Sequence, residues 1–216
     1  MLRLIRIVAA LALTAAAGAA FPAPPASRAQ ALSALEGDDT VHRAEAVVWI
    51  AEHGRMEDTQ RLAARLRDES PLVRDAAEQA LWRLWSRSGD EAVDRLLARG
   101  AEAMEAGRYP EAIGTFSEVI RRRPEFAEGW NKRATAYFLS GRLDASRADC
   151  DEVLRRNPQH FGALAGYGLI YFRQADYENA IAWWQRALEV NPNMAGVAAN
   201  MAQARALLRD RRARTI

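Results

Sequence analysis

The chain has very few of the residues from which catalytic and metal sites are built. Its 216 residues include one cysteine, Cys150, one lysine, Lys132, and only three histidines. A single cysteine excludes an internal disulfide, and the histidines lack the His-Glu-x-x-His spacing of a metal site. No glycine-rich loop precedes the lysine, which excludes a phosphate-binding loop of the common type. We therefore predict no enzymatic activity, no cofactor and no metal.

Acidic residues are absent from residues 1–29. This segment has a basic start, Met-Leu-Arg-Leu-Ile-Arg, an apolar run at 7–20 and a Ser27-x-Ala29 pattern at its end. These parts are typical of a secretory signal peptide, and the apolar run is too short for a comfortable membrane span. We predict export, with cleavage after Ala20 or, better by the small-residue pattern, after Ala29, so that residues 1–29 form the signal peptide. An uncleaved membrane anchor and an organelle transit peptide are the alternatives.

The excess of basic charge is confined to this predicted signal segment. Without residues 1–29 the chain has 27 basic and 28 acidic side chains, so no nucleic-acid partner is expected. Nearly all basic residues are arginine and alanine is abundant, which points to a GC-rich bacterial genome and to the periplasm as the destination. Membrane contact is expected only through the signal segment or through the basic tail after Arg205.

A fixed period is the main feature that the sequence does contain. Pro124, Pro158 and Pro192 lie 34 residues apart, and a period of this length is typical of stacked helical repeats. Each proline follows a predicted helix, which it ends because it cannot donate a backbone N–H. The prolines divide the chain into units 93–126, 127–160 and 161–194. No alternating strand pattern is present, so we predict an all-α fold.

Small and large residues recur in the same register of the three units. Both helices of a unit carry packing residues of mixed size, so that a large residue at one place faces a small one at another. The first helices carry Leu96, Gly100 and Ala103, then Trp130, Ala134 and Tyr137, then Leu164, Gly168 and Tyr171; the second helices carry Ala112, Phe116 and Val119, then Ser146, Cys150 and Val153, then Ala180, Trp184 and Ala187. The small residues let two helices approach closely while the large ones fill the gaps. This pattern resembles the tetratricopeptide repeat family over 102 residues.

The middle and last units depart from the family pattern. Ser146 and Cys150 replace the usual alanine and aromatic residue, so we expect looser packing around Cys150, a buried small hydrophobe. Ala175 stands at the turn where Gly107 and Gly141 occur in the other units.

The resemblance implies a right-handed α-solenoid whose first helices line a concave, peptide-binding groove. Amides there would bond an extended peptide backbone, while apolar side chains and the small residues Gly162, Ala165 and Gly166 give contact and room. The predicted groove residues are Met104, Asn131, Lys132, Thr135, Phe138, Leu169, Phe172, Asn200 and Gln203. Packing between helices is an equal alternative for both phenylalanines, as is a solvated charge for Lys132.

One class of tetratricopeptide repeat grips C-terminal carboxylates with basic and amide side chains. The matching positions here hold Leu97, Ala101, Lys132, Gly162 and Gly166. Only the lysine could serve, so this carboxylate clamp is predicted to be absent. An internal peptide segment or a folded partner is the expected ligand.

Residues 30–90 show helical periodicity without the 34-residue register. Ser70, followed by proline, is predicted to cap a helix. The string Asp-Glu-Ser-Pro-Leu-Val-Arg-Asp-Ala-Ala at 68–77 resembles part of a HEAT repeat, in which Asp68 and Arg74 would be structural. We expect this segment to stack against the repeats at 91–194 in one continuous solenoid, because a lone unit leaves an apolar face exposed.

The remaining features suggest structure more than chemistry. Residues 195–216 are predicted to be a capping helix with a solvated basic tail. Glu128, Asp149 and His160 are expected on solvated surfaces or in an exposed turn. The predicted function is a non-catalytic protein-interaction scaffold. The alternative is a structural subunit of a cell-envelope assembly that uses its edges, either Trp82 and Trp85 or the terminal helix.

Overall fold

The computed structural model describes residues 23–214, which are helical and contain no strand in that range. The predicted signal segment therefore lies mostly outside the described residues. The chain divides into two compact units, Met1–Ser86 and Arg87–Ile216, close to the predicted boundary at 90.

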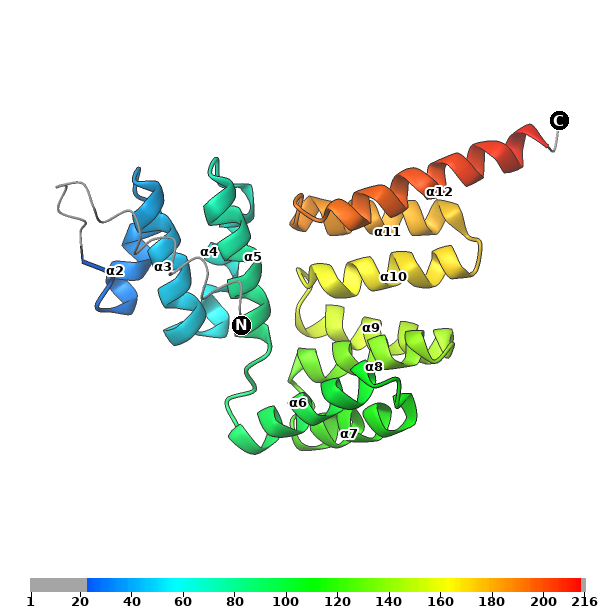
Figure 1. Cartoon of the computed structure of the whole chain (residues 1–216), viewed down its shortest axis with the longest axis horizontal. Helices are drawn as coiled ribbons and strands as arrows, with labels where there is room; N and C mark the ends of the chain where they lie inside the picture. The colour runs from blue at the N-terminus through cyan, green and yellow to red at the C-terminus, as the bar shows by residue number, and fades with distance from the viewer. Residues whose placement is uncertain (1–22, 215–216) are drawn as a thin grey trace. The chain divides into compact units, whose positions relative to one another are not determined.

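The first unit is built from short helices that pack around α3 and α5 (Figure 1). Its elements are α2 (Arg28–Ala34), α3 (Thr40–His53), the 3-10 turn η1 (Met56–Asp58), α4 (Thr59–Ala64), η2 (Arg65–Arg67) and α5 (Pro71–Trp85). The side chains of Ser27 and Asp39 cap α2 and α3. Ser70 is the N-cap residue of α5 and Pro71 begins the helix, as predicted, but the Ser70 hydroxyl makes no capping hydrogen bond. Asp68 Oδ1 instead accepts from the Ser70 backbone N–H at 3.0 Å.

Two arginine–aspartate pairs join the elements of the first unit. Arg43 of α3 donates to Asp68 at 2.9 Å, and both side chains are buried. Burial opposes the charge of Asp68, but the hydrogen bonds from Arg43 and the Ser70 backbone N–H, together with the charges of Arg43 and Arg65, outweigh it and lower the pKa of Asp68. Arg74 donates to the Asp68 carbonyl oxygen at 2.8 Å. The carboxylate of Asp68 is thus held by Arg43, while Arg74 holds its backbone.

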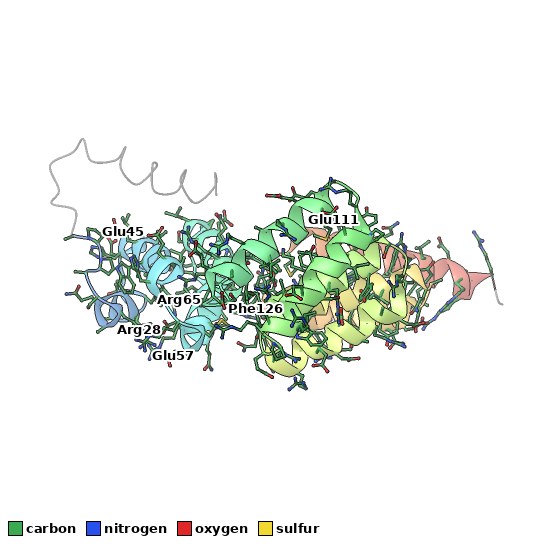
Figure 2. All side chains as sticks on the ribbon, turned by 90° about the horizontal axis from the view of Figure 1, so that it is seen from below. Arg28, Glu45, Glu57, Arg65, Glu111 and Phe126 are labelled. Carbon is green, nitrogen blue, oxygen red and sulfur yellow. The ribbon has the colours of Figure 1, made fainter. Side chains whose placement is uncertain are left out.

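The second pair involves the start of α2. Arg28 donates to both carboxylate oxygens of Asp58, with Nη2 at 2.6 Å from Oδ1 and Nε at 3.1 Å from Oδ2. Arg28 also forms an ion pair with Glu57 at 2.7 Å, near the edge of the unit in Figure 2. The predicted signal cleavage site after Ala29 therefore lies inside α2. It also follows Arg28, the residue that neutralises the buried carboxylate of Asp58.

The second unit consists of helix pairs in the predicted register, seen in Figure 1 as successive layers. Its helices are α6 (Glu91–Glu105), α7 (Tyr109–Arg122), α8 (Ala127–Leu139), α9 (Leu143–Arg156), α10 (Phe161–Arg173), α11 (Tyr177–Val190) and α12 (Ala195–Ala213). The helices of each predicted unit pack against each other, and α12 packs on α11. The basic tail is helical as far as Ala213, and Arg211 pairs with Glu178 at 2.9 Å.

Glycines let the first and second helices of the outer repeats touch. A Cβ atom at Gly100 would lie 2.4 Å from the Phe116 ring, and one at Gly168 would lie 2.2 Å from Trp184 Nε1. Real Cβ atoms do not approach so closely, so each aromatic ring occupies the space that the missing side chain leaves.

The turns inside the repeats use left-handed backbone. Gly107 and Gly141 have φ values of 71° and 79°, and Ala175 has a φ of 58° at the corresponding place. Glycine adopts this conformation without steric penalty, whereas alanine does not. Ala175 therefore carries backbone strain that the other two turns avoid.

Candidate functional site

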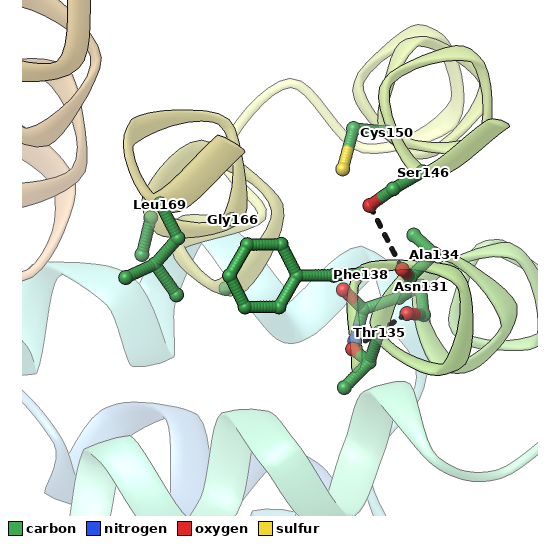
Figure 3. Close-up of a pocket in the computed structure, with 10 residues that line it drawn as sticks. Asn131, Ala134, Thr135, Phe138, Ser146, Cys150, Gly166 and Leu169 are labelled. Atoms are coloured by element: carbon green, nitrogen blue, oxygen red, sulfur yellow. Dashed lines mark hydrogen bonds between the residues drawn. The ribbon is translucent and has the colours of Figure 1, made fainter. Parts of the chain in front are cut away.

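A pocket of about 130 Å³ lies between α8, α9 and α10, in the second and third repeats (Figure 3). Ala134, Ser146 and Cys150 at its floor are buried, whereas Thr135 and Phe138 at its rim are half-buried. The full lining consists of Asn131, Ala134, Thr135, Phe138, Ser146, Cys150, Gly162, Ala165, Gly166 and Leu169.

The pocket arises where the middle repeat departs from the residue types of the outer repeats. Cys150 takes the position that Phe116 and Trp184 occupy in the outer repeats, and it leaves space that their rings would fill. A Cβ atom at Gly166 would lie 3.7 Å from Cys150 Sγ, so the missing side chain of Gly166 opens the space further. The expectation of looser packing around Cys150 is confirmed.

Neither the hydroxyl nor the thiol at the floor of the pocket is a reactive group. The Ser146 hydroxyl donates to the Ala134 carbonyl oxygen at 2.8 Å, the dashed line at the right of Figure 3. Burial, together with the negative charges of Asp149 and Asp151, raises the pKa of Cys150 to about 12. The thiol is therefore protonated at neutral pH and behaves as a small apolar group.

Asn131 lines the pocket and is held in one orientation. Its side-chain Nδ2 donates to Glu128 Oε2 at 3.0 Å, which distinguishes the amide nitrogen from the oxygen. In the described part of the chain Oδ1 has no hydrogen-bond partner, and it is not sealed from solvent. Asn131 thus offers one free acceptor at the pocket.

Glu128 is the centre of a buried polar cluster behind Asn131. Its Oε2 lies 3.2 Å from His160 Nε2, and Lys132 Nζ lies 3.2 Å from Oε1. His160 Nδ1 accepts from the Ala163 backbone N–H, so a neutral imidazole donates to Glu128 through Nε2. Burial opposes ionisation of Glu128, but the hydrogen bond from His160 and the charge of Lys132 prevail and lower the pKa of Glu128.

Three predictions about charged or polar side chains were wrong. His160 is fully buried, not in an exposed turn, because it caps α10 and reaches Glu128 on α8. Glu128 is buried for the same reason. Asp149 is also buried and accepts from Arg133 Nε at 2.7 Å.

The structure brings together four of the nine predicted groove residues. Asn131, Thr135, Phe138 and Leu169 line the pocket. Outside the pocket, Lys132 pairs with Glu128 and Met104 packs on the core of the first repeat. Phe172 packs against Tyr177 and Trp184, with ring centroids 5.5 and 5.6 Å away; Asn200 is half-buried and Gln203 exposed on α12.

Sequence reasoning expected room at Gly162, Ala165 and Gly166, and all three line the pocket. It did not identify the floor residues Ala134 and Ser146 as part of a binding surface, although the unusual register at 146 and 150 was the available signal. The floor belongs to α9 as well as α8, so a search confined to first helices omits it.

The described residues hold few other candidates for chemistry. No group of three His, Cys, Asp or Glu side chains within residues 23–214 is placed to hold a metal ion. No described helix is both long and apolar enough to cross a membrane. Among the assembly edges considered above, Trp85 is buried and Trp82 is half-buried.

A tetratricopeptide repeat model matches residues 97–160 and 141–195. A repeat-containing protein of Rhizobium etli is 34% identical over 108 residues, covering 50% of this chain and 53% of that protein. The Hsp70-Hsp90 organizing protein of Triticum aestivum is 30% identical over 95 residues, covering 44% of this chain and 16% of that protein. The chain thus spans about half the length of the first of these relatives and less of the second.

Solved structures share the fold. The first repeat domain of Spaghetti (RPAP3) bound to HSP90 peptide SRMEEVD has a TM-score of 0.52 and 23% identity, covering 54% of this chain and 92% of that one. The Sgt2 repeat domain of Aspergillus fumigatus has a TM-score of 0.54 and 22% identity, covering 57% and 83%. Residues 97–195 of this chain therefore match the tetratricopeptide repeat model and stack as an α-solenoid, the fold that these structures share.

Proposed function

We propose that the repeats form a non-catalytic scaffold that binds an extended peptide segment of a partner protein across the second and third repeats. The observation that carries the proposal is the pocket, because it joins predicted groove residues from α8 and α10 in one concave place. A free acceptor at Asn131 and apolar side chains at Phe138 and Leu169 suit a peptide backbone with an apolar side chain.

The proposed ligand is an internal peptide segment and needs no terminal carboxylate. A clamp for a carboxylate requires several positive or amide groups that converge on one point. Of the five matching positions, Leu97 is buried in the core and the two glycines have no side chain. Lys132 is the one cation among them, and Glu128 already holds it.

Peptide selection with purified protein tests the proposal. A display library of internal, random peptides is bound to residues 21–216, and affinities of the selected peptides are measured by calorimetry. Leu169→Asp places a charge at the pocket rim and is expected to weaken binding by at least about tenfold. The matched control is Leu139→Asp, because Leu139 is 43% exposed and does not line the pocket. Failure to select any peptide, or equal weakening by both variants, would contradict the proposal.

We further propose that the chain is exported to a bacterial periplasm and that the first unit is HEAT-like. The basic and apolar pattern of residues 1–20 supports export. Cleavage after Ala20 would retain Ser27, which caps α2, and Arg28, which pairs with buried Asp58. Cleavage after Ala29 would remove both and leave a buried carboxylate without its arginine.

The mature N-terminus tests this proposal. The protein is recovered from an osmotic-shock fraction of a Gram-negative host that expresses the full chain, and its first residue is read by mass spectrometry. We expect Phe21. A first residue of Gln30 would contradict the proposed cleavage site, and protein that stays in the cytoplasm with residues 1–20 would contradict export.

A further inference from the structure

We infer that the pocket of the middle repeat receives one aliphatic side chain of the bound peptide, of the size of leucine, isoleucine or methionine. This inference rests on the proposed function and specifies which chemistry the groove selects. Three observations carry it: the volume of the pocket, the chemistry of its floor and the acceptor that Asn131 offers.

The volume limits the size of the occupant. A cavity of about 150 Å³ lined by aliphatic and aromatic side chains accepts benzene. The pocket here measures about 130 Å³, so a side chain of four heavy atoms fits and the double ring of tryptophan does not. Alanine would leave most of the space empty and lose the dispersion contacts of the walls.

The chemistry of the floor excludes a charged occupant. The Ser146 hydroxyl is already bonded to the Ala134 carbonyl oxygen, and the Cys150 thiol is buried. A carboxylate or ammonium group inserted between them would lose its water without gaining a partner. An aliphatic group gains contact with Cys150 and with the ring of Phe138, which Figure 3 shows projecting toward Gly166 and Leu169.

The Asn131 side chain supplies an acceptor for the peptide backbone. Asn131 lines the same pocket, and its Nδ2 is held by Glu128. Oδ1 therefore remains available to accept one backbone N–H of the peptide while the adjacent side chain enters the pocket. Glu128 acts here as a positioning residue, because it sets the orientation of the amide without touching the ligand.

The outer repeats show that such a space can be closed. In them the equivalents of Cys150 are aromatic and face a glycine whose Cβ would clash with the ring. The middle repeat has Ala134 and Cys150 instead, and the third repeat contributes Gly166 rather than a larger residue. All three residues line the pocket.

A positional-scanning library of acetylated and amidated hexapeptides tests the inference. Each position is fixed in turn as Leu, Ile, Met, Ala, Asp or Trp, and binding to wild-type protein is measured. We expect one position to favour Leu, Ile or Met by at least about tenfold over Ala, Asp and Trp, a discrimination of the order that a few methylene groups provide.

Two variants fill the pocket from opposite sides. Gly166→Ala adds a methyl group at ordinary contact distance from Cys150, and Cys150→Leu fills the floor. Both are expected to weaken the selected peptide by about tenfold and to reduce the preference over its alanine version. Gly114→Ala is the control, because Gly114 also lies inside a helix but a Cβ there meets nothing within 4 Å.

The outcomes separate this inference from the proposed function. Peptide binding without an aliphatic preference would overturn the inference and leave the scaffold proposal standing. Unchanged selectivity in folded Gly166→Ala protein would also overturn it, whether or not Cys150→Leu folds. If wild-type protein binds no peptide of the library, both the inference and the proposed function fail.

Discussion

The middle repeat differs from its two neighbours in the pair of residues that joins its first helix to its second. In the outer repeats, Gly100 faces Phe116 and Gly168 faces Trp184, with no room for another atom between them. In the middle repeat the same register holds Ala134 and Cys150, which line a pocket. One architecture thus tolerates two packing solutions, and the less complete one provides the candidate site.

The largest expected effect on stability comes from adding a side-chain atom between Gly168 and Trp184, which are in tight contact. Gly168→Ala places a Cβ atom 2.2 Å from Trp184 Nε1, and overpacking of this kind should lower the free energy of unfolding by about 3 kcal/mol. Ala134→Gly in the middle repeat introduces no clash. Through helix propensity it should lower the free energy of unfolding by about 1 kcal/mol. Urea unfolding of both variants measures the difference, and equal values would contradict the comparison.

The buried cluster of the middle repeat should make stability depend on pH. The folded-state pKa of Glu128 lies below its usual value of 4.5, so the unfolded chain binds more protons at low pH. The stabilisation by Glu128 is then fully present above about pH 4.5 and is lost as the pH falls below it.

Glu128→Gln checks this dependence. At pH 7 the variant should be less stable by about 2 kcal/mol, because Lys132 loses its anionic partner and His160 a charged acceptor. Its stability should vary less between pH 5 and pH 3 than that of the wild type. The matched control is Glu125→Gln, since the Glu125 side chain is 81% exposed. A control with the same loss and the same flattened profile would refute the assignment to Glu128.

Placing the glycine–aromatic pair of the outer repeats at positions 134 and 150 of the middle repeat should show that these two positions are energetically coupled. Cys150→Phe alone brings a ring against the Cβ of Ala134 and should be destabilising, whereas the double variant with Ala134→Gly relieves the contact. A double-mutant cycle should give a favourable coupling of about 1.5 kcal/mol. Additive effects would mean that the two positions do not share the space.

The smallest expected effect lies in the turn of the third repeat. Ala175 has a φ of 58° where the other repeats have glycine. Ala175→Gly should raise the free energy of unfolding by about 0.5 kcal/mol, the relief of left-handed strain less the entropy that glycine loses on folding. Thermal unfolding beside Gly141→Ala, which should be destabilised, provides the check; a lower melting temperature for Ala175→Gly would count against strain at this turn.

Much of the second unit could be predicted from the sequence, because its information is local and periodic. The three prolines and the spacing of small and large residues located the helix pairs, and the departure at Cys150 indicated loose packing. The cluster of Glu128, His160 and Lys132 could not be predicted in this way. Its key contact joins residues 32 positions apart, and a histidine in a turn gives no sign that it will fold back onto the first helix of its own unit.

The depth of the predicted groove residues could not be predicted, for a similar reason. Helical periodicity identifies which side chains share a face, but not how deep each lies. Asn131 shares the predicted face yet is only 8% exposed, because Glu128 draws its amide inward. The start of α2 was missed because Arg28 was assigned to a signal segment, whereas its partner Asp58 belongs to the folded unit.

The affinity of the Ala134→Gly, Cys150→Phe double variant for the peptide selected by wild-type protein tests the central claim most directly. The aromatic ring should close the pocket while the paired glycine preserves the helix packing. We predict a folded protein, no less stable than Ala134→Gly alone, whose affinity is reduced by at least about tenfold. Unchanged affinity in that folded variant would contradict the claim that the loosely packed middle repeat is the binding site.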